Sequence, residues 1–383
     1  MHFRSVAKVV CSACAGAGLL LALWPAWRLC LAQSAEPGLT PHVEPWLQAD
    51  QLFRSDPRWL GGDVAYSIDL GRERVLWLFG DSFIADLAGA QRGQATMVRN
   101  SVAIQTGYDP SRSSLKFYWK KERGQPASFV PGTGDVWLWP AHGVRLGGKL
   151  LLFFTRVRPD SRKDSLGFEN FGWAAFLVDN PDEEPSAWVL QRAAVPSNTR
   201  NVIAGAAALV VSQFLYVFSP AEPSHDIYLL RWPLCAAAKG DLASPKWWCG
   251  LKHGWAKHPE AAHPPVPAIR QGAMEFSVQW VPQRRKFLMV QSVGMGASDI
   301  AVRWADRLEG PWPAPGAVYR PEESARPDAL VYAAKAHAEL AGADLVITYV
   351  ANSRDFGILT RDPSIYYPRF VRLWFSPHDV YEK

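Results

Sequence analysis

Two aspartates that flank a short predicted hairpin are the first candidates for chemistry. Asp63 precedes an alternating segment over 64–70, and Asp81 follows the continuous apolar run over 75–79. These segments predict a half-buried strand and a strand buried on both faces. Pairing across the short turn places Asp63 opposite Asp81, with Cβ atoms about 4.5–5.5 Å apart. Carboxylates at that separation repel and split their pKa values, as acid/base catalysis requires. The alternative is two ordinary turn aspartates, because Gly-Asp is common in turns.

The first 32 residues have the composition of a secretory signal peptide. Arg4 and Lys8 precede a small and apolar run over 9–27, and Cys30-Leu31-Ala32 offers the small residues that a signal peptidase reads. We therefore expect cleavage after Ala32 and a secreted or periplasmic protein without stable membrane insertion. The alternative is an uncleaved anchor that spans the membrane once.

Residues 33–50 have the composition of a linker, and residues 51–383 are long enough for one large domain. The leader contains three of the 41 basic residues and none of the 36 acidic ones, so its removal lowers the formal net charge from +5 to +2. No basic block or basic helix remains, which argues against a nucleic-acid partner. We expect the mature protein to be a monomer.

Two cysteines remain after removal of the leader. Cys235 and Cys249 lie in one excursion between predicted strands, and in an oxidising compartment they could form a single disulfide. The alternative is a pair of buried thiols.

The rest of the chain repeats a hairpin followed by a third strand. Short runs rich in Val, Leu, Phe, Trp and Tyr alternate with Gly, Pro, Asn and Asp, which indicates an all-β fold. Five such units at intervals of about 60–75 residues predict a five-bladed β-propeller, whereas a two-sheet sandwich would not explain the common strand order. The predicted hairpins span 64–79, 143–154, 206–218, 276–290 and 338–349.

In a propeller, the first strand of each unit lines the central channel, and the residues before these strands gather at one mouth. Four of the five residues at this position are ionisable, which is typical of a site on a rigid scaffold. Glu275 is a candidate third carboxylate, and Trp137 or Trp139 a platform for stacking on sugar. For each residue the alternative is a structural hydrogen bond or an exposed rim charge. The residues before the five strands are Asp63, His142, Gly205, Glu275 and His337, and the candidate binders of sugar hydroxyls are His142, His337, Asn100, Asn352 and Arg369.

Other chemistries have little support. No Cys/His cluster has zinc-site spacing, and neither a nucleophile elbow nor a phosphate-binding glycine loop occurs. We expect no cofactor. Aspartate and backbone oxygens could hold a structural calcium ion in the channel, but no residue spacing requires one.

Several segments resemble a family of secreted bacterial five-bladed propellers whose characterised members are endo-D-arabinanases. The similarity runs from about residue 51 to the C-terminus, and the first unit carries its most specific part. In that family the aspartates that match Asp63 and Asp81 are the catalytic pair. The segments that carry the resemblance are 61–67, 76–83, 99–105, 275–278, 335–340, 348–353 and 367–370.

Together these observations predict a secreted glycoside hydrolase that acts on a polysaccharide, with a D-arabinan or related furanoside polymer implied by the resemblance. One of Asp63 and Asp81 would protonate the leaving oxygen, and the other would act as nucleophile or activate water. Directly opposed carboxylates favour the retaining mechanism. The alternative function is a non-catalytic carbohydrate-binding propeller of an envelope polysaccharide system.

Overall fold

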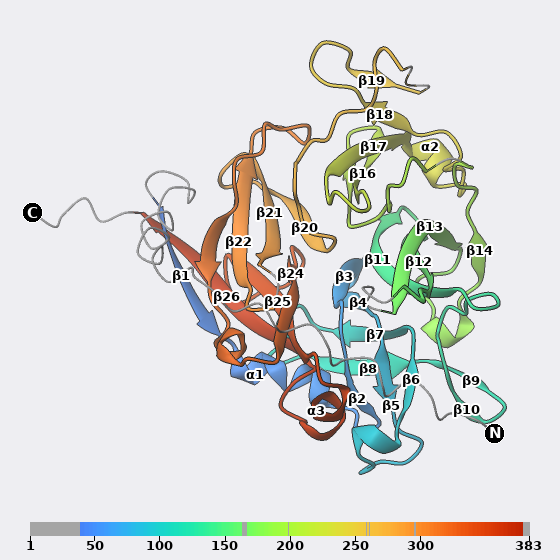
Figure 1. Ribbon diagram of the computed structural model, residues 1–383, viewed down its shortest axis with the longest axis vertical. Helices are drawn as coiled ribbons and strands as arrows, with labels where there is room; N and C mark the ends of the chain where they lie inside the picture. The colour runs from blue at the N-terminus through green and yellow to red at the C-terminus, as the bar shows by residue number, and fades with distance from the viewer. Residues whose placement is uncertain are drawn as a thin grey trace, which may run out of the picture.

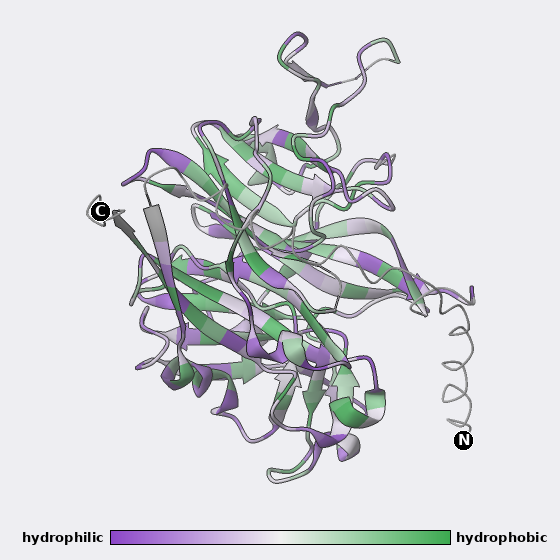
Figure 2. Ribbon diagram, turned by 60° about the vertical axis from the view of Figure 1, so that its left-hand side comes forward, coloured by the Kyte–Doolittle hydropathy of each residue, from purple (hydrophilic) through white to green (hydrophobic). Residues whose placement is uncertain are grey.

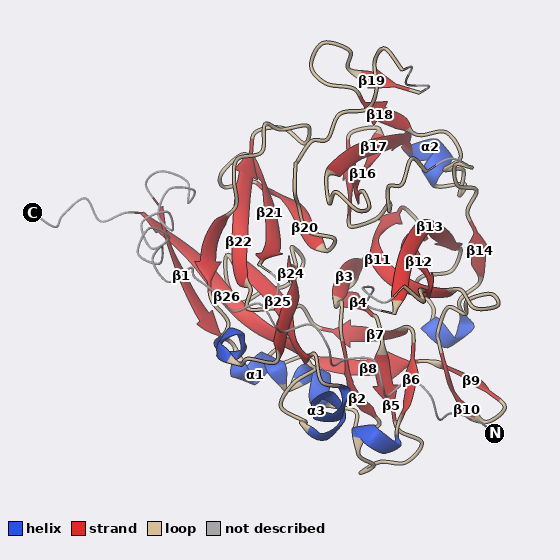
Figure 3. Cartoon of the chain, in the orientation of Figure 1, coloured by secondary structure: helices blue, strands red, loops and turns tan. Residues whose placement is uncertain are grey.

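The computed structural model describes residues 39–162, 167–197, 199–257, 259, 261–294 and 296–377 (Figure 1). The predicted signal peptide lies outside these residues. The described chain is all-β, as predicted, with only short helices between its strands (Figure 3). None of its helices is long and apolar enough to cross a membrane. The helical segments are α1 (Leu47–Asp50), η2 (Leu52–Arg54), η3 (Arg92–Gln94), η4 (Pro185–Ala187), α2 (Leu234–Ala237), η5 (Glu322–Ala325) and α3 (Phe356–Arg361).

Five antiparallel sheets follow one another along the chain, and each begins with the strand nearest the middle of the molecule (Figure 1). The first sheet contains β3 (Tyr66–Gly71), β4 (Arg74–Phe79), β7 (Ser101–Thr106) and β8 (Ser114–Tyr118). The second contains β11 (Trp137–Leu146), β12 (Lys149–Pro159), β13 (Phe168–Val178) and β14 (Leu190–Arg192). The third contains β15 (Ala207–Val211), β16 (Phe214–Pro220), β17 (Ile227–Pro233), β18 (Lys246–Trp248) and β19 (Trp255–Ala256).

The fourth sheet contains β20 (Phe276–Val281), β21 (Lys286–Val293), β22 (Asp299–Ala305) and β23 (Gly316–Tyr319). The fifth contains β24 (Ala329–Ala336), β25 (Leu345–Ser353), β26 (Pro368–Pro377) and β1 (Leu39–Pro45). Two smaller sheets extend from the first: β2 (Trp59–Gly62) with β5 (Ser82–Ile84) and β6 (Thr96–Val98), and β9 (Lys120–Glu122) with β10 (Gln125–Ala127).

Each neighbouring pair of sheets buries an apolar cluster between its faces. The alternation of the strands puts the large side chains there, and Figure 2 shows the hydrophobic residues along the strands with hydrophilic ones in the loops. Burying one such side chain contributes about 1.5–3 kcal/mol. The five clusters are represented by Ile68 with Leu152, Phe153 with Val217, Phe218 with Phe276, Leu288 with Ile347, and Trp77 with Phe370. The last cluster joins the first sheet to the fifth.

The linker predicted over 33–50 is wrong from Leu39 onward. Strand β1 (Leu39–Pro45) pairs with β26, the last strand of the chain, and Trp46 and Ala49 next to it are buried. In the segment 39–45, prolines and polar residues are interspersed with two apolar residues. Such a composition resembles a linker, but it is also tolerated in an edge strand, where one side of the backbone needs no partner.

The fifth predicted hairpin is displaced along the chain. Its first strand is β24 (Ala329–Ala336), and residues 337–344 form the connection to β25. A bulge interrupts the pairing of β24 between Tyr332 and Lys335, and Ala333 within it has a φ of 62°. The bulge and the alanine-rich composition hide the alternation that identifies a strand. As a result, His337 follows the first strand of its sheet instead of preceding it.

Candidate active site

Asp63 and Asp81 lie where the first sheet passes into the small sheet of β2 and β5. Gly62 of β2 pairs with Ser82 of β5, and the ladder of β3 with β4 keeps the same register. Asp63 therefore lies opposite Asp81, as the sequence predicts. The backbone amide of Gly80 donates to the carbonyl oxygen of Asp63 over 3.1 Å, which holds the two segments together at this point.

The backbone directly after Asp63 has an unusual conformation. Val64 and Ala65 have φ values of 72° and 51°, and the amide of Ala65 donates to the carbonyl oxygen of Asp63 over 2.9 Å. Left-handed backbone is costly for a β-branched residue such as valine, and such strain is concentrated at functional sites. The predicted strand thus begins at Tyr66 rather than at Val64, and Asp63 is held in a tight turn.

Gly80 lies directly against the Asp63 carboxylate. A Cβ atom at this position would lie 2.3 Å from Asp63 Oδ1 and 2.7 Å from Val64 Cγ2. Any larger residue would displace the carboxylate, so a glycine is required next to Asp81 for steric reasons.

Tyr332 of the fifth sheet holds the Asp63 carboxylate in place. The hydroxyl of Tyr332 donates to Asp63 Oδ2 over 2.8 Å, and Asn352 Nδ2 donates to that hydroxyl over 3.2 Å. Burial raises the pKa of Asp63 to about 8, and the charges of Asp81 and Glu275 add to this effect against the opposing hydrogen bonds. Asp63 therefore keeps its proton at neutral pH.

Asp81 has positively polarised partners instead. Arg99 Nη1 lies 2.9 Å from Asp81 Oδ2, and Trp139 Nε1 donates to Asp81 Oδ1 over 2.8 Å. Burial raises the pKa of Asp81 as well, but the charge of Arg99 and both hydrogen bonds lower it. When the pair holds a single proton, that proton consequently belongs on Asp63 and the charge on Asp81.

Glu275 is the third carboxylate near the pair and precedes β20 of the fourth sheet. Lys335 Nζ lies 3.5 Å from Glu275 Oε2 and 4.5 Å from the centre of the Tyr66 ring. The Lys335 side chain is 1% exposed, and burial lowers its pKa while the charge of Glu275 opposes that shift. Lys335 thus places a buried amino group against Glu275, beside the aspartate pair.

The two histidines predicted to bind sugar hydroxyls are occupied within the fold. His142 Nδ1 accepts from the amide of Ala208 over 3.0 Å, so Nε2 carries the proton toward the carbonyl oxygen of Ser67, 3.2 Å away. His337 lies 2.5 Å from Ser67 Oγ through Nδ1 and 2.8 Å from Thr348 Oγ1 through Nε2. Burial lowers the pKa of His142 to about 4 and that of His337 well below its usual value. Both histidines therefore join sheets as neutral side chains, and their binding of sugar hydroxyls stays a prediction.

Two further predicted binders are also engaged elsewhere. Asn100 is 1% exposed, donates to the carbonyl oxygens of Val130 and Leu138 over 2.9 and 2.8 Å, and accepts from the amide of Val130 over 2.7 Å. It anchors a loop, and the prediction that it binds substrate is wrong. Arg369 Nε lies 2.8 Å from Glu323 Oε1, and the structure does not bring this guanidinium to the aspartate pair.

The structure contradicts the predicted disulfide, because both cysteines are free. Cys235 is exposed on α2, whereas Cys249 is buried behind β18 with its thiol 3.6 Å from the carbonyl oxygen of Trp247. One side chain thus belongs to the outer surface and the other to the core of the third sheet.

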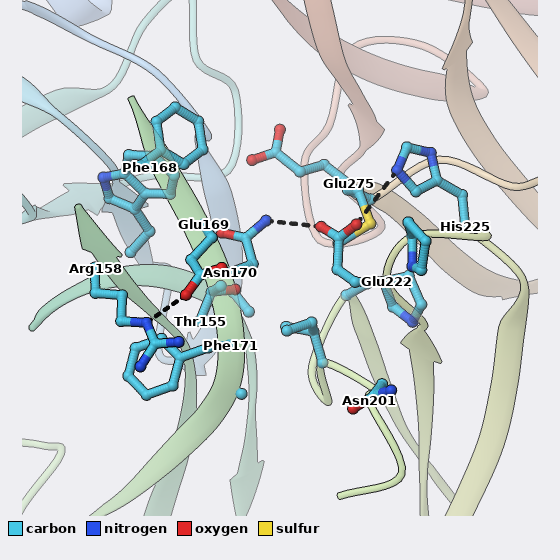
Figure 4. A pocket seen from close by; sticks show the side chains of 18 of the residues that line it. Thr155, Arg158, Phe168, Glu169, Asn170, Phe171, Asn201, Glu222, His225 and Glu275 are labelled. Carbon is cyan, nitrogen blue, oxygen red and sulfur yellow. Dashed lines mark hydrogen bonds and ion pairs between the residues drawn. The ribbon is translucent and has the colours of Figure 1, made fainter. Parts of the chain in front are cut away.

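A pocket of about 860 Å³ opens beside the aspartate pair, between the second, third and fourth sheets (Figure 4). Asp63 and Asp81 do not line it themselves, but Trp139 and Glu275 do, so the pocket borders the pair. Trp139 packs edge-on against Phe168, with ring centres 4.7 Å apart. Trp139 therefore lines the pocket, as expected of a platform, and also positions Asp81, which the sequence did not indicate.

Four residues that contact the carboxylates were missed as site residues from the sequence. They come from elements far apart in the chain. Tyr332 and Lys335 belong to β24 of the fifth sheet, whose first strand was displaced in the prediction, and Tyr366 lies in the loop before β26. The only available signal was that Arg99 directly precedes Asn100 at the predicted mouth. The missed residues are Arg99, Tyr332, Lys335 and Tyr366.

Residues 47–375 match the family described as Domain of unknown function (DUF5005), and the chain belongs to this family. No curated protein matches the chain. A proposed hydrolase from Bacteroides ovatus ATCC 8483 is 17% identical, with a TM-score of 0.69 over 88% of this chain and 92% of the other, and this likeness shows a common fold.

Two glycoside hydrolases superpose less closely. The catalytic domain of the GH62 α-L-arabinofuranosidase from Coprinopsis cinerea is 12% identical, with a TM-score of 0.45 over 89% of this chain and 97% of the other. An α-L-arabinofuranosidase from Podospora anserina, solved with cellotriose, is 13% identical, with a TM-score of 0.44 over 88% of this chain and 96% of the other.

Proposed function

We propose that this protein is a secreted glycoside hydrolase with a five-bladed β-propeller fold. The observation that carries the proposal is the opposed pair of half-buried aspartates with unlike partners. Burial and the nearby carboxylates favour the protonated form of Asp63, against the opposing hydrogen bond from the Tyr332 hydroxyl. Asp81 lies against a guanidinium and an indole N–H, which favour its ionised form. Glycoside hydrolysis needs one carboxyl group in each state.

The roles follow from these states. Asp63 donates its proton to the glycosidic oxygen as the bond to the leaving sugar breaks, and Asp81 stabilises the positive charge that develops at the anomeric carbon. The direct opposition of the two residues favours attack by Asp81 itself and a covalent glycosyl intermediate, hence retention of configuration. Glu275, paired with Lys335, is a third carboxyl group beside the reacting sugar.

The proposed substrate is a polysaccharide, with a D-arabinan or related furanoside polymer as the first candidate. This choice rests on the resemblance of the first unit to endo-D-arabinanases. The five sheets in chain order, with an apolar cluster between every neighbouring pair including the first and fifth, support the propeller architecture. The leader sequence supports export, and with it a polymer outside the cytoplasm as substrate.

A panel of neutral and charged polysaccharides, with products separated by chromatography, tests the proposal. Wild-type protein should release oligosaccharides from at least one polymer, and Asp63→Asn and Asp81→Asn should each lower the rate by a thousandfold or more, as loss of a catalytic group does. Asp69→Asn is the matched control, because Asp69 lies on the same hairpin, exposed and at its turn end.

Cleavage that persists in both aspartate variants would refute the assignment. If the wild-type protein cleaves no polymer but binds one, the carbohydrate-binding alternative replaces the enzyme. Proton NMR of the first-formed product then decides between retention and inversion at the anomeric carbon.

A further inference from the structure

Three hydrogen-bond acceptors from three different sheets converge in the pocket beside the aspartate pair (Figure 4). Asn170 belongs to β13 of the second sheet, Glu222 follows β16 of the third, and Glu275 precedes β20 of the fourth. Figure 4 shows the Glu222 carboxylate between Asn170 and His225, with the Glu275 side chain on the neighbouring wall of the pocket. Because the three elements are rigidly packed against each other, these acceptors keep a fixed geometry.

The orientation of the Asn170 amide is determined by its neighbour. Asn170 Nδ2 donates to Glu222 Oε1 over 3.0 Å, and a carboxylate oxygen can only accept there. The amide oxygen Asn170 Oδ1 is then the atom that does not contact Glu222 Oε1. This oxygen is buried and has no hydrogen-bond partner among the described residues. A buried acceptor without a partner is costly, and a ligand that donates to it removes that cost.

Ionisable side chains that line the pocket near these acceptors form ion pairs with one another. Glu222 Oε2 lies 3.7 Å from Nε2 of the half-exposed His225. Arg158, which also lines the pocket, forms an ion pair with Glu169 and lies with its guanidinium carbon 4.8 Å from the centre of the Phe171 ring. The inner wall is therefore rich in acceptors and negative charge.

The same pocket is continuous with the catalytic centre. Trp139 lines it and donates to Asp81, and Glu275 lies close enough to Asp63 to raise the pKa of that carboxyl. A sugar polymer with one unit at the aspartate pair has its next units in this pocket, whose volume of about 860 Å³ holds more than one sugar ring.

We propose that the pocket is a subsite for a neutral sugar unit adjacent to the cleaved bond, in which Asn170 Oδ1, Glu222 and Glu275 accept hydrogen bonds from its hydroxyl groups. Adjacent hydroxyls supply donors to these acceptors, and the aromatic side chains contact the apolar face of the ring. A sugar with a carboxylate is excluded, because its charge would face two other carboxylates. This inference rests on the proposed function and specifies its substrate class.

Binding measured without turnover tests the subsite. In an Asp63→Asn background, isothermal titration calorimetry with neutral tetrasaccharides (arabino-, xylo- and cello-oligomers) should find at least one that binds, and tetragalacturonate should bind at least tenfold more weakly. Adding Glu222→Gln should weaken the neutral ligand about tenfold or more, because it replaces a charged acceptor by a donor. Asn170→Leu, similar in size, should have an effect of the same order.

The matched control is Glu122→Gln, which alters an exposed glutamate on β9 and should leave binding unchanged. Circular dichroism of each variant verifies that it is folded. Equal binding with and without Glu222→Gln, equal binding of tetragalacturonate, or no binding of any neutral tetrasaccharide overturns the subsite. If the wild-type protein cleaves nothing but Glu222→Gln still weakens a neutral ligand, the subsite stands and the hydrolase function fails.

Discussion

Replacing Asp63 by asparagine should stabilise the folded protein at neutral pH while it removes activity. Asparagine keeps the size of the side chain and an acceptor oxygen for the Tyr332 hydroxyl, but it cannot ionise. In the wild-type protein, burial raises the pKa of Asp63 from 3.8 to about 8. The native site therefore holds a proton that the unfolded chain gives up at much lower pH.

The magnitude follows from proton linkage. Below pH 3.8 both states carry the proton, and between 3.8 and about 8 only the folded state does, so stability falls as the pH rises through this window. Each pH unit in the window costs about 1.4 kcal/mol. From pH 4 to pH 7 the wild-type free energy of unfolding should thus fall by about 4 kcal/mol relative to that of Asp63→Asn. This is an upper value, because Asp63 is only partly shielded from solvent.

Urea unfolding followed by tryptophan fluorescence at several pH values between 4 and 7 measures this difference. The quantity of interest is the free energy of unfolding of Asp63→Asn minus that of the wild type, since effects common to both proteins cancel. Asp69→Asn serves as the control, and its difference should stay flat. If the Asp63→Asn difference also changes by less than about 1 kcal/mol over this range, Asp63 is not a buried protonated carboxyl and its role as the acid fails.

Four further predictions concern activity, packing and thiol chemistry. If Asp63 is the acid, wild-type activity should decline above about pH 8, where it loses its proton, as a pH–rate profile would reveal. Trp139→Phe removes an N–H donor to the ionised carboxylate, so kcat/KM should fall about tenfold and the acid limb of the profile should move to higher pH. Asn100→Ala leaves three buried backbone groups unpaired and should lower the free energy of unfolding by about 2–5 kcal/mol in urea titrations, whereas an unchanged value would contradict its anchoring role. Iodoacetamide should alkylate exposed Cys235 in the native protein and buried Cys249 only after unfolding, as mass spectrometry of peptides would show.

The sequence was most informative where local rules govern the structure. Alternation and turn residues located four of the five hairpins, and counting across the first turn put Asp63 opposite Asp81. Both inferences depend only on neighbouring residues. The fifth hairpin was misplaced because the bulge at Ala333 breaks the alternation on which such inferences depend.

The partners of the carboxylates were not predictable, because long-range pairing decides them. Tyr332 contacts Asp63 from a position 269 residues later in the chain, and no sequence periodicity indicates that contact. The histidines illustrate the opposite error. A histidine near a mouth suggests a ligand contact, but whether both ring nitrogens already have partners depends on the facing sheets. His142 and His337 do, through Ser67 and neighbouring groups.

The pairing of β1 with β26 has a consequence for how the chain must fold. The outermost strand of the fifth sheet is the first strand of the described chain, and its partner is the last. While the chain is being synthesised or exported from its N-terminus, β1 has no partner until every other sheet has emerged. Four sheets can form in order, but the fifth is completed by a contact of very high sequence separation, which is typical of a late and slow step. Deleting residues 39–45 should therefore remove the final, slow phase of refolding while the early phases keep their rates.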